Sequence, residues 1–170
     1  MKHSHVRIDD HLYIHGAPAS RMLRTLNEGV QACITITLID GLVLARSAFH
    51  HSMNYRSVVA LGTLMPVTDP DEKSRILDAL VEHVAPGRSA DARPPSNNER
   101  NGTALMSMPL KEASAKIRTG PPVDDEDDYN LPIWAGVLPL TLQPGIPIPD
   151  DRLNTEITCP DYVQNYTRTQ

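Results

Sequence analysis

The side chains best suited to bind an anion lie in the segment 12–22 of this 170-residue sequence. Residues 11–15 alternate in polarity and predict a strand, which leads through the small residues 16–19 into a helix that starts at Ser20. Free N–H groups at a helix start favour negative charge, and Ser20 and Arg21 add a hydroxyl and a guanidinium suited to phosphate. A plain helix cap followed by a surface arginine would give the same pattern, so both interpretations stay open.

Three further groups could contact a ligand. Arg56 and Ser57 stand where polar residues lead into an apolar strand, and Lys116 and Arg118 occupy alternate positions and so share one side of a strand. Trp134, the only tryptophan, is flanked by small residues and could wall a flat ligand or fill the core. Ordinary solvent exposure explains the four polar residues as well.

The histidine and cysteine pattern does not predict a metal site or a nucleophile. The pairs His3/His5 and His50/His51 have no carboxylate or cysteine at ligand spacing, and adjacent residues on a strand point to opposite faces. The sequence contains no nucleophile elbow, phosphate loop or Cys-Xaa-Xaa-Cys motif. Cys33 is therefore interpreted as an inward-facing core residue.

The elements that must position these residues are mostly strands. Strands are predicted over 31–39, 42–45 after an Asp40-Gly41 hairpin turn, 55–65, 103–109 and 131–142. The clearest helix starts at Pro70, capped by Asp69 with Glu72 as its capping-box partner, and stops at Pro86-Gly87. Residues 88–102 and the acidic run 124–128 are predicted to be solvated loops, and 111–119 is ambiguous between strand and helix. This order predicts a β-rich α+β domain of the barrel type, with one long and one short helix.

Composition excludes several classes of protein. The hydrophobic fraction of 40% supports a core, which must be aliphatic because aromatics are only 4% of the residues. The formal net charge is −5, which disfavours a nucleic-acid binder that works through phosphates. No apolar stretch is long enough to span a membrane, no secretory signal is visible, and two cysteines do not make a disulfide scaffold. The default expectation is a cytoplasmic protein.

Taken in order, these segments resemble a known family. The sequence is similar to the FMN-binding split barrels related to pyridoxamine 5′-phosphate oxidase, and within them to the flavin-nucleotide-binding proteins related to nitroimidazole-resistance proteins. The resemblance covers roughly residues 9–142, and its signature stretches are 15–23, 40–46, 50–59 and 113–122. It implies a split β-barrel fold and a homodimer with two FMN sites at the subunit interface.

The resemblance also implies roles for individual residues. Ser20 and Arg21 match the phosphate contacts, Ser57 with Arg56 falls on the strand that lines the flavin, and Trp134 matches a tryptophan that reaches the partner's cofactor. Met22 replaces a lysine of the oxidases, so one phosphate cation is either missing or supplied elsewhere, by Lys116 or Arg118. The predicted cofactor-binding set is His15, Ser20, Arg21, Thr35, Arg56, Ser57, Lys116, Arg118 and Trp134. No catalytic acid or base is assigned; His15 and His50 are the only candidates near the inferred site.

The family pattern carries a helix and two strands before the strand at His11, whereas this chain begins just upstream of that strand. The expected organisation is a shortened FMN-binding domain over 1–143 and a loosely ordered C-terminal tail over 144–170. The leading hypothesis is a cytoplasmic FMN-binding flavoprotein, with an oxidoreductase activity of unknown substrate as its expected function. The alternatives are a non-catalytic flavin-binding or regulatory module, and a shortened dimerising paralogue that has lost FMN. A strand at His11 without upstream neighbours would be an unpaired edge.

Overall fold

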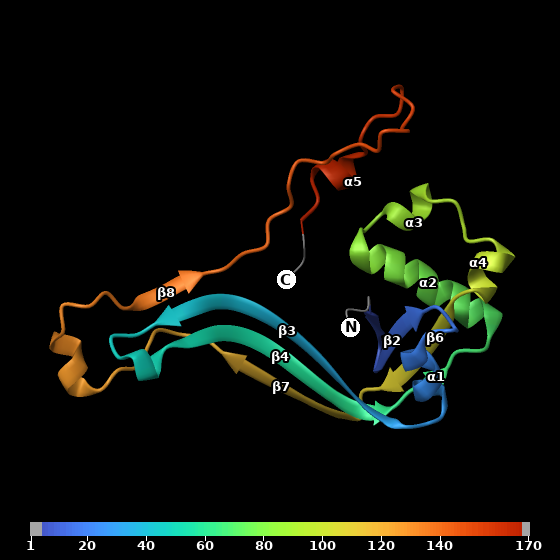
Figure 1. Ribbon diagram of the computed structural model, residues 1–170. Helices are drawn as coiled ribbons and strands as arrows, with labels where there is room; N and C mark the ends of the chain where they lie inside the picture. Colours follow the sequence, from blue (N-terminus) through green and yellow to red (C-terminus); the bar gives the residue numbers. More distant parts are fainter. Residues whose placement is uncertain (1–4, 168–170) are drawn as a thin grey trace. The chain divides into compact units, whose positions relative to one another are not determined.

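The computed structural model describes residues 5–167, and the chain folds into two compact units (Figure 1). The first, called here the helical unit, comprises residues 1–32, 62–111 and 143–170. The second, called the strand unit, comprises residues 33–61 and 112–142. Each unit is assembled from stretches that are far apart in the sequence, so each is held together by long-range contacts.

The helical unit contains a four-stranded sheet in which β2 has a neighbour on both sides. The strand order is β1 (His5–Ile8), β2 (His11–Gly16), β6 (Ala104–Pro109) and β5 (Met65–Pro66). Both β1 and β6 pair with β2 in antiparallel register, with Ile8 opposite His11 at the β1–β2 turn. The expectation that the strand at His11 is an unpaired edge is therefore wrong. The four residues of β1 alternate in polarity, but so short a run is a weak strand signal.

Five helices belong to the helical unit within the described residues. They are α1 (Arg21–Asn27), α2 (Pro70–Val84), α3 (Arg88–Asp91), α4 (Asn97–Asn101) and α5 (Asp161–Gln164). As predicted, α2 starts at Pro70 and Asp69 caps it, because the Asp69 carboxylate accepts the Glu72 N–H at 2.7 Å. Residues 88–102, predicted to be a loop, contain α3 and α4, and a capping box formed by Ser96 and Glu99 starts α4. No helix among residues 5–167 combines the length and apolarity needed to cross a bilayer.

The core of the helical unit lies between α2 and the sheet. Its central cluster is Val6, Tyr13, Ile76, Leu80 and Leu105. Ile76 is fully buried, and Tyr13 faces α2 from the middle of β2. Burial of this helix face against the sheet is the main source of stability that the unit can supply by itself. As the composition requires, the cluster is mostly aliphatic.

The strand unit is one sheet of long strands, which Figure 1 shows as curved ribbons side by side. The order is β7 (Glu112–Arg118), β4 (Ser52–Thr63), β3 (Gln31–Leu44) and β8 (Gly136–Pro139), with short 3₁₀ turns η1 (Ala48–His50) and η2 (Glu126–Asn130) in the connections. The ambiguous stretch 111–119 is thus a strand. The last predicted strand is shorter than expected and ends at Pro139.

The predicted hairpin at Asp40-Gly41 is wrong, because β3 runs through both residues without turning. Gly41 instead permits close approach of β8: a Cβ atom built at this position would lie 3.0 Å from the carbonyl oxygen of Leu138. A glycine inside a strand often marks such an approach of a second backbone. The local sequence cannot distinguish this role from a turn.

The C-terminal segment contacts the end of α2 through two tyrosines. The Tyr166 hydroxyl donates to the carbonyl of Val84 at 2.9 Å, and the Arg88 guanidinium donates to the Tyr162 hydroxyl at 3.1 Å. The Tyr162 ring also lies against Gly87. The division at residues 143 and 144, and the loose order of the tail, remain predictions.

Candidate functional site

Ser20 and Arg21 are brought together at the start of α1. Ser20 is the N-cap residue, but its hydroxyl forms no capping hydrogen bond, and Arg21 is exposed. Leu23 and Leu26 are the buried residues of α1. Both predicted phosphate residues line a surface hollow of about 500 Å³. The hydroxyl is therefore not used for capping, and the role of the pair as phosphate contacts stays a prediction.

The strand unit has a polar face, defined by Thr35, Thr37, Ser57 and Lys116. Ser57 lies directly opposite Lys116 in the β4–β7 register, so the two side chains share a face. The hydroxyls of Thr37 and Ser57 are hydrogen-bonded at 2.8 Å, and Thr35 lies two residues before Thr37 on β3. Cys33 is also on this side and is exposed, so its interpretation as a core residue is wrong. Three of the predicted cofactor residues (Thr35, Ser57 and Lys116) are thus neighbours.

Arg56 lies on the other face of β4, where it forms a two-pronged ion pair with Asp40. Its Nη2 and Nε atoms donate to the two carboxylate oxygens of Asp40 at 2.7 and 2.9 Å. This hydrogen bonding lowers the pKa of Asp40 below 3.8 and raises the pKa of Arg56. Arg56 and Ser57, predicted as one ligand-binding pair, therefore point to opposite sides of the sheet, and part of the guanidinium fork is already engaged.

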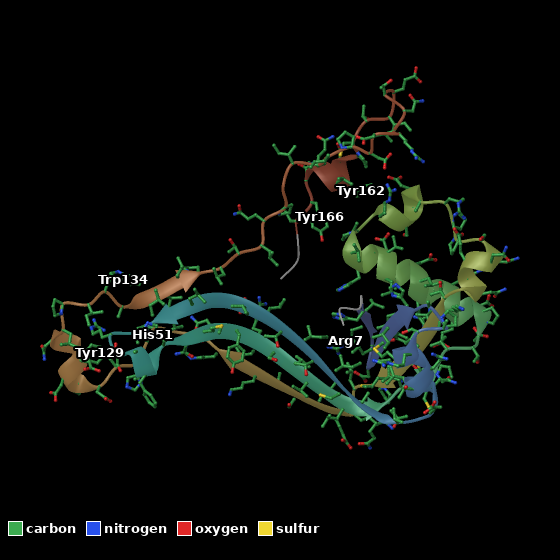
Figure 2. The ribbon with its side chains drawn as sticks, viewed as in Figure 1. Arg7, His51, Tyr129, Trp134, Tyr162 and Tyr166 are labelled. Carbon is green, nitrogen blue, oxygen red and sulfur yellow. The ribbon has the colours of Figure 1, made fainter. Side chains whose placement is uncertain are left out.

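Arg118 and Trp134 also belong to the strand unit, but they contact neither the polar face residues nor the Arg56–Asp40 pair in any interaction described for them. Arg118 donates to the side-chain oxygen of the buried Asn54 at 2.6 Å, and the Asn54 amide in turn donates to the carbonyl of Gly120 at 3.1 Å. Trp134 is 68% exposed, and its ring lies over Gly136, where an added Cβ atom would meet it at 2.9 Å. Figure 2 shows the tryptophan close to the start of β8. Its large apolar surface is available to a ligand or a partner.

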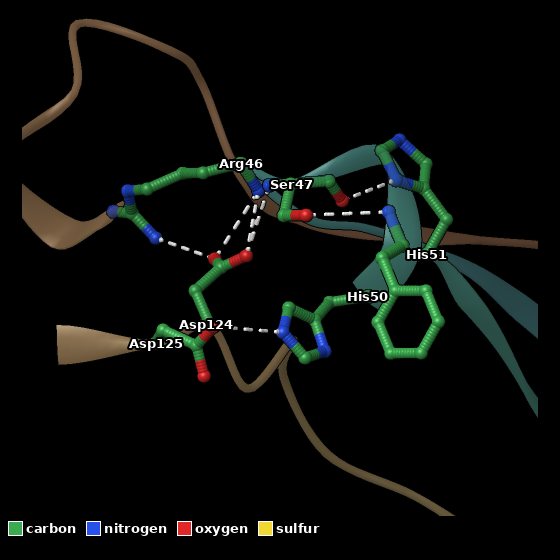
Figure 3. Close-up of polar contacts among 7 residues, drawn as sticks. Arg46, Ser47, His50, His51, Asp124 and Asp125 are labelled. Carbon is green, nitrogen blue, oxygen red and sulfur yellow. Dashed lines mark hydrogen bonds and ion pairs between the residues drawn. The ribbon is translucent and has the colours of Figure 1, made fainter. Parts of the chain in front are cut away.

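A buried carboxylate that the sequence did not single out organises the turn after β3. The side chain of Asp124 has no solvent exposure and accepts hydrogen bonds from the N–H groups of Arg46 (3.0 Å) and Ser47 (3.1 Å) and from the Arg46 guanidinium (3.1 Å) (Figure 3). Burial by itself would raise the pKa of Asp124, but the hydrogen bonds from Ser47 and Arg46 outweigh it, so the pKa lies below 3.8. The prediction of a solvated acidic loop is therefore wrong for this first member of the run.

The surroundings of Asp124 are also ordered by aromatic and histidine contacts. The Arg46 guanidinium stacks over the ring of Tyr129 at 4.9 Å, and His50 lies 3.6 Å from the carboxylate of Asp125. His51 contacts the carbonyl oxygen of Ser47 at 3.0 Å. The histidines 50 and 51 thus face different partners, although neither lies on a strand: His50 ends the 3₁₀ turn η1 and His51 follows it. His3 lies outside the described residues, and among residues 5–167 no group of three or more metal-ligating side chains comes together.

His15 lines an apolar cavity of the helical unit. His15 lies two residues after Tyr13 on β2, so both side chains point to the face of the sheet that α2 covers. The cavity has a volume of about 490 Å³. Its lining is His15, Leu77, Asp78, Leu80, Val81, Val84, Ala85, Arg88, Arg93, Pro95, Glu99 and Thr103. The Nδ1 atom of His15 is buried and has no hydrogen-bond partner among the described residues, an arrangement that costs free energy unless a ligand satisfies it.

The polar side of this cavity comes from α3, α4 and the segment between them. The Arg93 guanidinium is paired with the Glu99 carboxylate at 2.8 and 3.0 Å, and this bonding, with the N–H of Ser96, lowers the pKa of Glu99 to about 2. Arg88 is instead bonded to the neutral phenol of Tyr162, a contact that raises the pKa of Arg88. The charge of Asp91, which lies on the same short helix, also raises the pKa of Arg88, but no ion pair joins the two side chains among the described residues.

The predicted cofactor residues are thus divided between the two units. His15, Ser20 and Arg21 belong to the helical unit, where Ser20 and Arg21 share one hollow and His15 lines another cavity. The other six belong to the strand unit. Sequence reasoning missed Arg88, Arg93 and the apolar stripe of α2 as cavity residues, because nothing in the local sequence indicates that a polar segment folds back beside a helix.

Comparison with known proteins gives the family. Residues 3–117 match the family described as pyridoxamine 5′-phosphate oxidase. No curated protein matches the chain.

Two solved structures match nearly the whole chain. The flavocytochrome Anf3 from Azotobacter vinelandii is 40% identical with a TM-score of 0.87, and the match covers 94% of this chain and 74% of that chain. The FAD and heme binding protein from Mycobacterium smegmatis is 37% identical with a TM-score of 0.89, and the match covers 94% and 78%. A putative 5-nitroimidazole antibiotic resistance protein from Bacteroides thetaiotaomicron, 22% identical with a TM-score of 0.54 over 66% of this chain and 64% of that chain, has a similar fold. The predicted β-rich split-barrel fold is confirmed, and the chain belongs to the pyridoxamine 5′-phosphate oxidase family.

Proposed function

We propose that this chain is a flavin-binding redox protein. The observation that carries the proposal is its similarity, at 40% and 37% identity over 94% of its length, to a flavocytochrome and to an FAD and heme binding protein. A bound flavin would supply the electron transfer, while the protein binds and orients it and excludes competing reactions.

Two groups of residues fit a flavin nucleotide. Ser20 and Arg21 offer an unused hydroxyl and an exposed guanidinium in one hollow, which suits the phosphate. The polar face of the strand unit offers the hydroxyls of Thr35 and Ser57 and the ammonium of Lys116, which suit polar atoms of the ring system or the ribityl chain. FMN is the nucleotide that the sequence resemblance implies, whereas the second relative is described as binding FAD.

A homodimer is part of the same proposal. The strand unit leaves many large apolar side chains in contact with solvent, including Phe49, Met53, Val58, Ile117, Trp134 and Leu142. Exposed apolar area of this kind is typical of a surface that a partner covers. A second copy of the chain would bury it, and would place one copy's Trp134 where it can contact the other copy's ligand.

The direct test is the visible absorption spectrum of the purified full chain, together with chromatography of the nucleotide released by heat. Absorption bands near 370 and 450 nm with about one FMN or FAD per chain support the proposal, and the chromatogram decides between the nucleotides. A chain that is colourless as purified and that quenches neither FMN nor FAD fluorescence on titration would refute it. Turnover with reduced nicotinamide nucleotides separates an oxidoreductase from a non-catalytic flavin-binding module, and light scattering at micromolar concentration tests the dimer.

A second candidate function, a flavocytochrome that also holds haem, is favoured by the His15 cavity. Of the two solved structures that match 94% of the chain, one is described as a flavocytochrome and the other as an FAD and heme binding protein. The helical unit has an apolar cavity of about 490 Å³ into which a buried imidazole nitrogen without a partner among the described residues could bind a ligand. Imidazole is a common axial ligand of haem iron, and an apolar lining suits the porphyrin. A pyridine haemochrome assay on protein expressed with iron and a haem precursor tests this function.

A further inference from the structure

We propose that the cavity behind α2 is the haem site, with the imidazole of His15 as an axial ligand and Arg88 as the partner of a haem carboxylate. This inference rests on the second candidate function above, since it names the residues through which the chain would hold haem. It is carried by three independent features of the helical unit: an apolar wall, a buried imidazole nitrogen without a hydrogen-bond partner among the described residues, and the Arg88 cation at the rim, which is bonded to a tyrosine hydroxyl.

The apolar wall comes from one stripe of α2. Leu77, Leu80, Val81 and Val84 follow the spacing that places side chains on one side of a helix. Leu80 is buried in the core, but Val81 and Val84 are 37% and 57% exposed. The stripe therefore begins in the core and continues into the cavity, where the last two valines have apolar surface that no described residue covers. A porphyrin face would cover it.

The imidazole of His15 reaches the same cavity from β2. Tyr13, two residues earlier on β2, points to the same side of the sheet and packs in the core cluster with residues of α2. This packing and the pairing of β2 with β6 fix the position of the strand next to the cavity. The buried Nδ1 atom has no hydrogen-bond partner, and the two carboxylates in the lining are those of Asp78 and Glu99. Glu99 is committed to Arg93 and the N–H of Ser96, and Asp78 is exposed. An iron ion in the cavity would meet imidazole as its protein ligand.

The rim supplies one cation for a ligand carboxylate. Of the two arginines that line the cavity, Arg93 is neutralised by Glu99, whereas Arg88 is bonded to the uncharged hydroxyl of Tyr162. Because Arg88 keeps its charge and has further N–H donors, it can form a charge-assisted hydrogen bond with a propionate. The ligand that matches an apolar wall, one imidazole and one cation is an iron porphyrin with carboxylate arms.

The features of the cavity do not suit the flavin nucleotide. Ser20 and Arg21, the residues that fit its phosphate, line a different hollow, and the cavity's own lining includes the acidic residues Asp78 and Glu99. The helical unit therefore offers two sites with different chemistry, and haem and flavin should load independently.

The experiment uses the full chain, freed of haem and titrated with haemin, with the Soret and visible bands as the readout. We expect His15→Ala to weaken haem binding at least ~10-fold and to remove the bands of an imidazole-ligated iron, and we expect added imidazole to restore those bands. His11→Ala is the matched control: it removes an exposed imidazole from the same strand outside the cavity, and its spectrum should equal that of the wild type. Arg88→Gln should weaken binding several-fold without a change in the bands.

Two results would overturn the assignment. If the wild type binds haem and His15→Ala gives the same spectrum and affinity, the ligand lies elsewhere, while the flavocytochrome function stands. If the wild type binds no haem, both the assignment and that function fail, and flavin loading, measured separately at 450 nm, still decides the primary proposal. Should His15→Ala fail to fold, His15→Met keeps a ligand of different strength, so unchanged bands in that variant would refute the assignment equally.

Discussion

The helical unit and the strand unit differ in how much of their apolar surface they bury by themselves. In the helical unit, α2 covers the sheet and leaves Ile76 and Leu105 almost without exposure. The strand unit contains no long helix among its described residues, and Ile117 and Trp134 remain 66% and 68% exposed. The helical unit therefore buries its apolar side chains more completely than the strand unit does.

The same contrast extends to polar groups. In the helical unit a buried imidazole nitrogen is left without a partner beside a cavity, which is typical of a site that awaits a ligand. In the strand unit the buried carboxylate of Asp124 is fully satisfied by the turn around it, although the buried Nε atom of Arg46 beside it has no partner among the described residues. The difference is that the unpartnered nitrogen of His15 lies beside a cavity, whereas the Arg46 guanidinium is already bonded to Asp124 through another of its nitrogens. The following predictions test the comparison of the two units, from the largest expected effect to the smallest.

The largest effect is expected from matched truncations in the two units. Ile76→Ala should lower the free energy of unfolding by about 2–5 kcal/mol, because it leaves a cavity in a closed core. Ile117→Ala, at a site 66% exposed, should change it by less than about 0.5 kcal/mol in a monomer. Denaturant unfolding measures both. A large effect of Ile117→Ala that disappears on dilution would show that a second copy covers this side chain, and equal effects for both variants would break the comparison.

Two arginines should separate binding from stability. Arg21→Ala should weaken flavin binding at least ~10-fold, because removing a charge-assisted contact costs about 1.5–3 kcal/mol, and should leave the melting temperature unchanged. Arg56→Ala should instead lower the melting temperature, since it strands Asp40 without its partner. Fluorescence titration and thermal melting distinguish the two. Unchanged flavin affinity in Arg21→Ala would return this residue to the role of a surface arginine beside a helix cap.

Asp124 should make the strand unit sensitive to acid. Its pKa is below 3.8 in the folded chain, so its contribution to stability is present above that pH and is lost as the pH falls through the folded value. Asp124→Asn should lower the melting temperature at pH 7, because a neutral amide with N–H donors cannot accept all the hydrogen bonds from Arg46 and Ser47. Asp127→Asn, at an exposed position of the same acidic run, is the control and should melt like the wild type. Equal melting of the two variants would contradict the role given to Asp124.

Substitution of Glu99 should give the smallest change in stability, and this change should depend on pH in the acid range. The pKa of Glu99 falls from 4.5 to about 2, so the stability it contributes is present above pH 4.5 and is lost between pH 4.5 and 2. Glu99→Gln should lower the melting temperature slightly at pH 7 and should flatten the pH dependence in that window. Because the pair is exposed, the change should shrink in high salt. A pH profile identical to that of the wild type would show that the pair with Arg93 contributes nothing.

Local sequence signals predicted the elements whose causes lie within a few residues. The start of α2 follows from Asp69 and Pro70, and the helix after the strand at His11 follows from the small residues before Ser20. Where a signal had two physical causes, the prediction was wrong: Gly41 reads as a turn but serves the approach of β8, and Cys33 alternates like a core residue but lies on an uncovered face. The four-residue β1 was too short to predict.

The sequence by itself determined the family, the order of most elements and the segment that carries Ser20 and Arg21, because propensity, capping and alternation act between near neighbours. Only the tertiary structure decided which side chains meet. Asp124 binds backbone groups 77 and 78 residues away, Arg88 meets Tyr162 across 74 residues, and the cavity at His15 closes only where α2, α3 and α4 pack beside β2. These contacts depend on how sheets and helices pack, and no residue type or spacing specifies a partner at such a distance, since burial and hydrogen-bond geometry are properties of the whole fold.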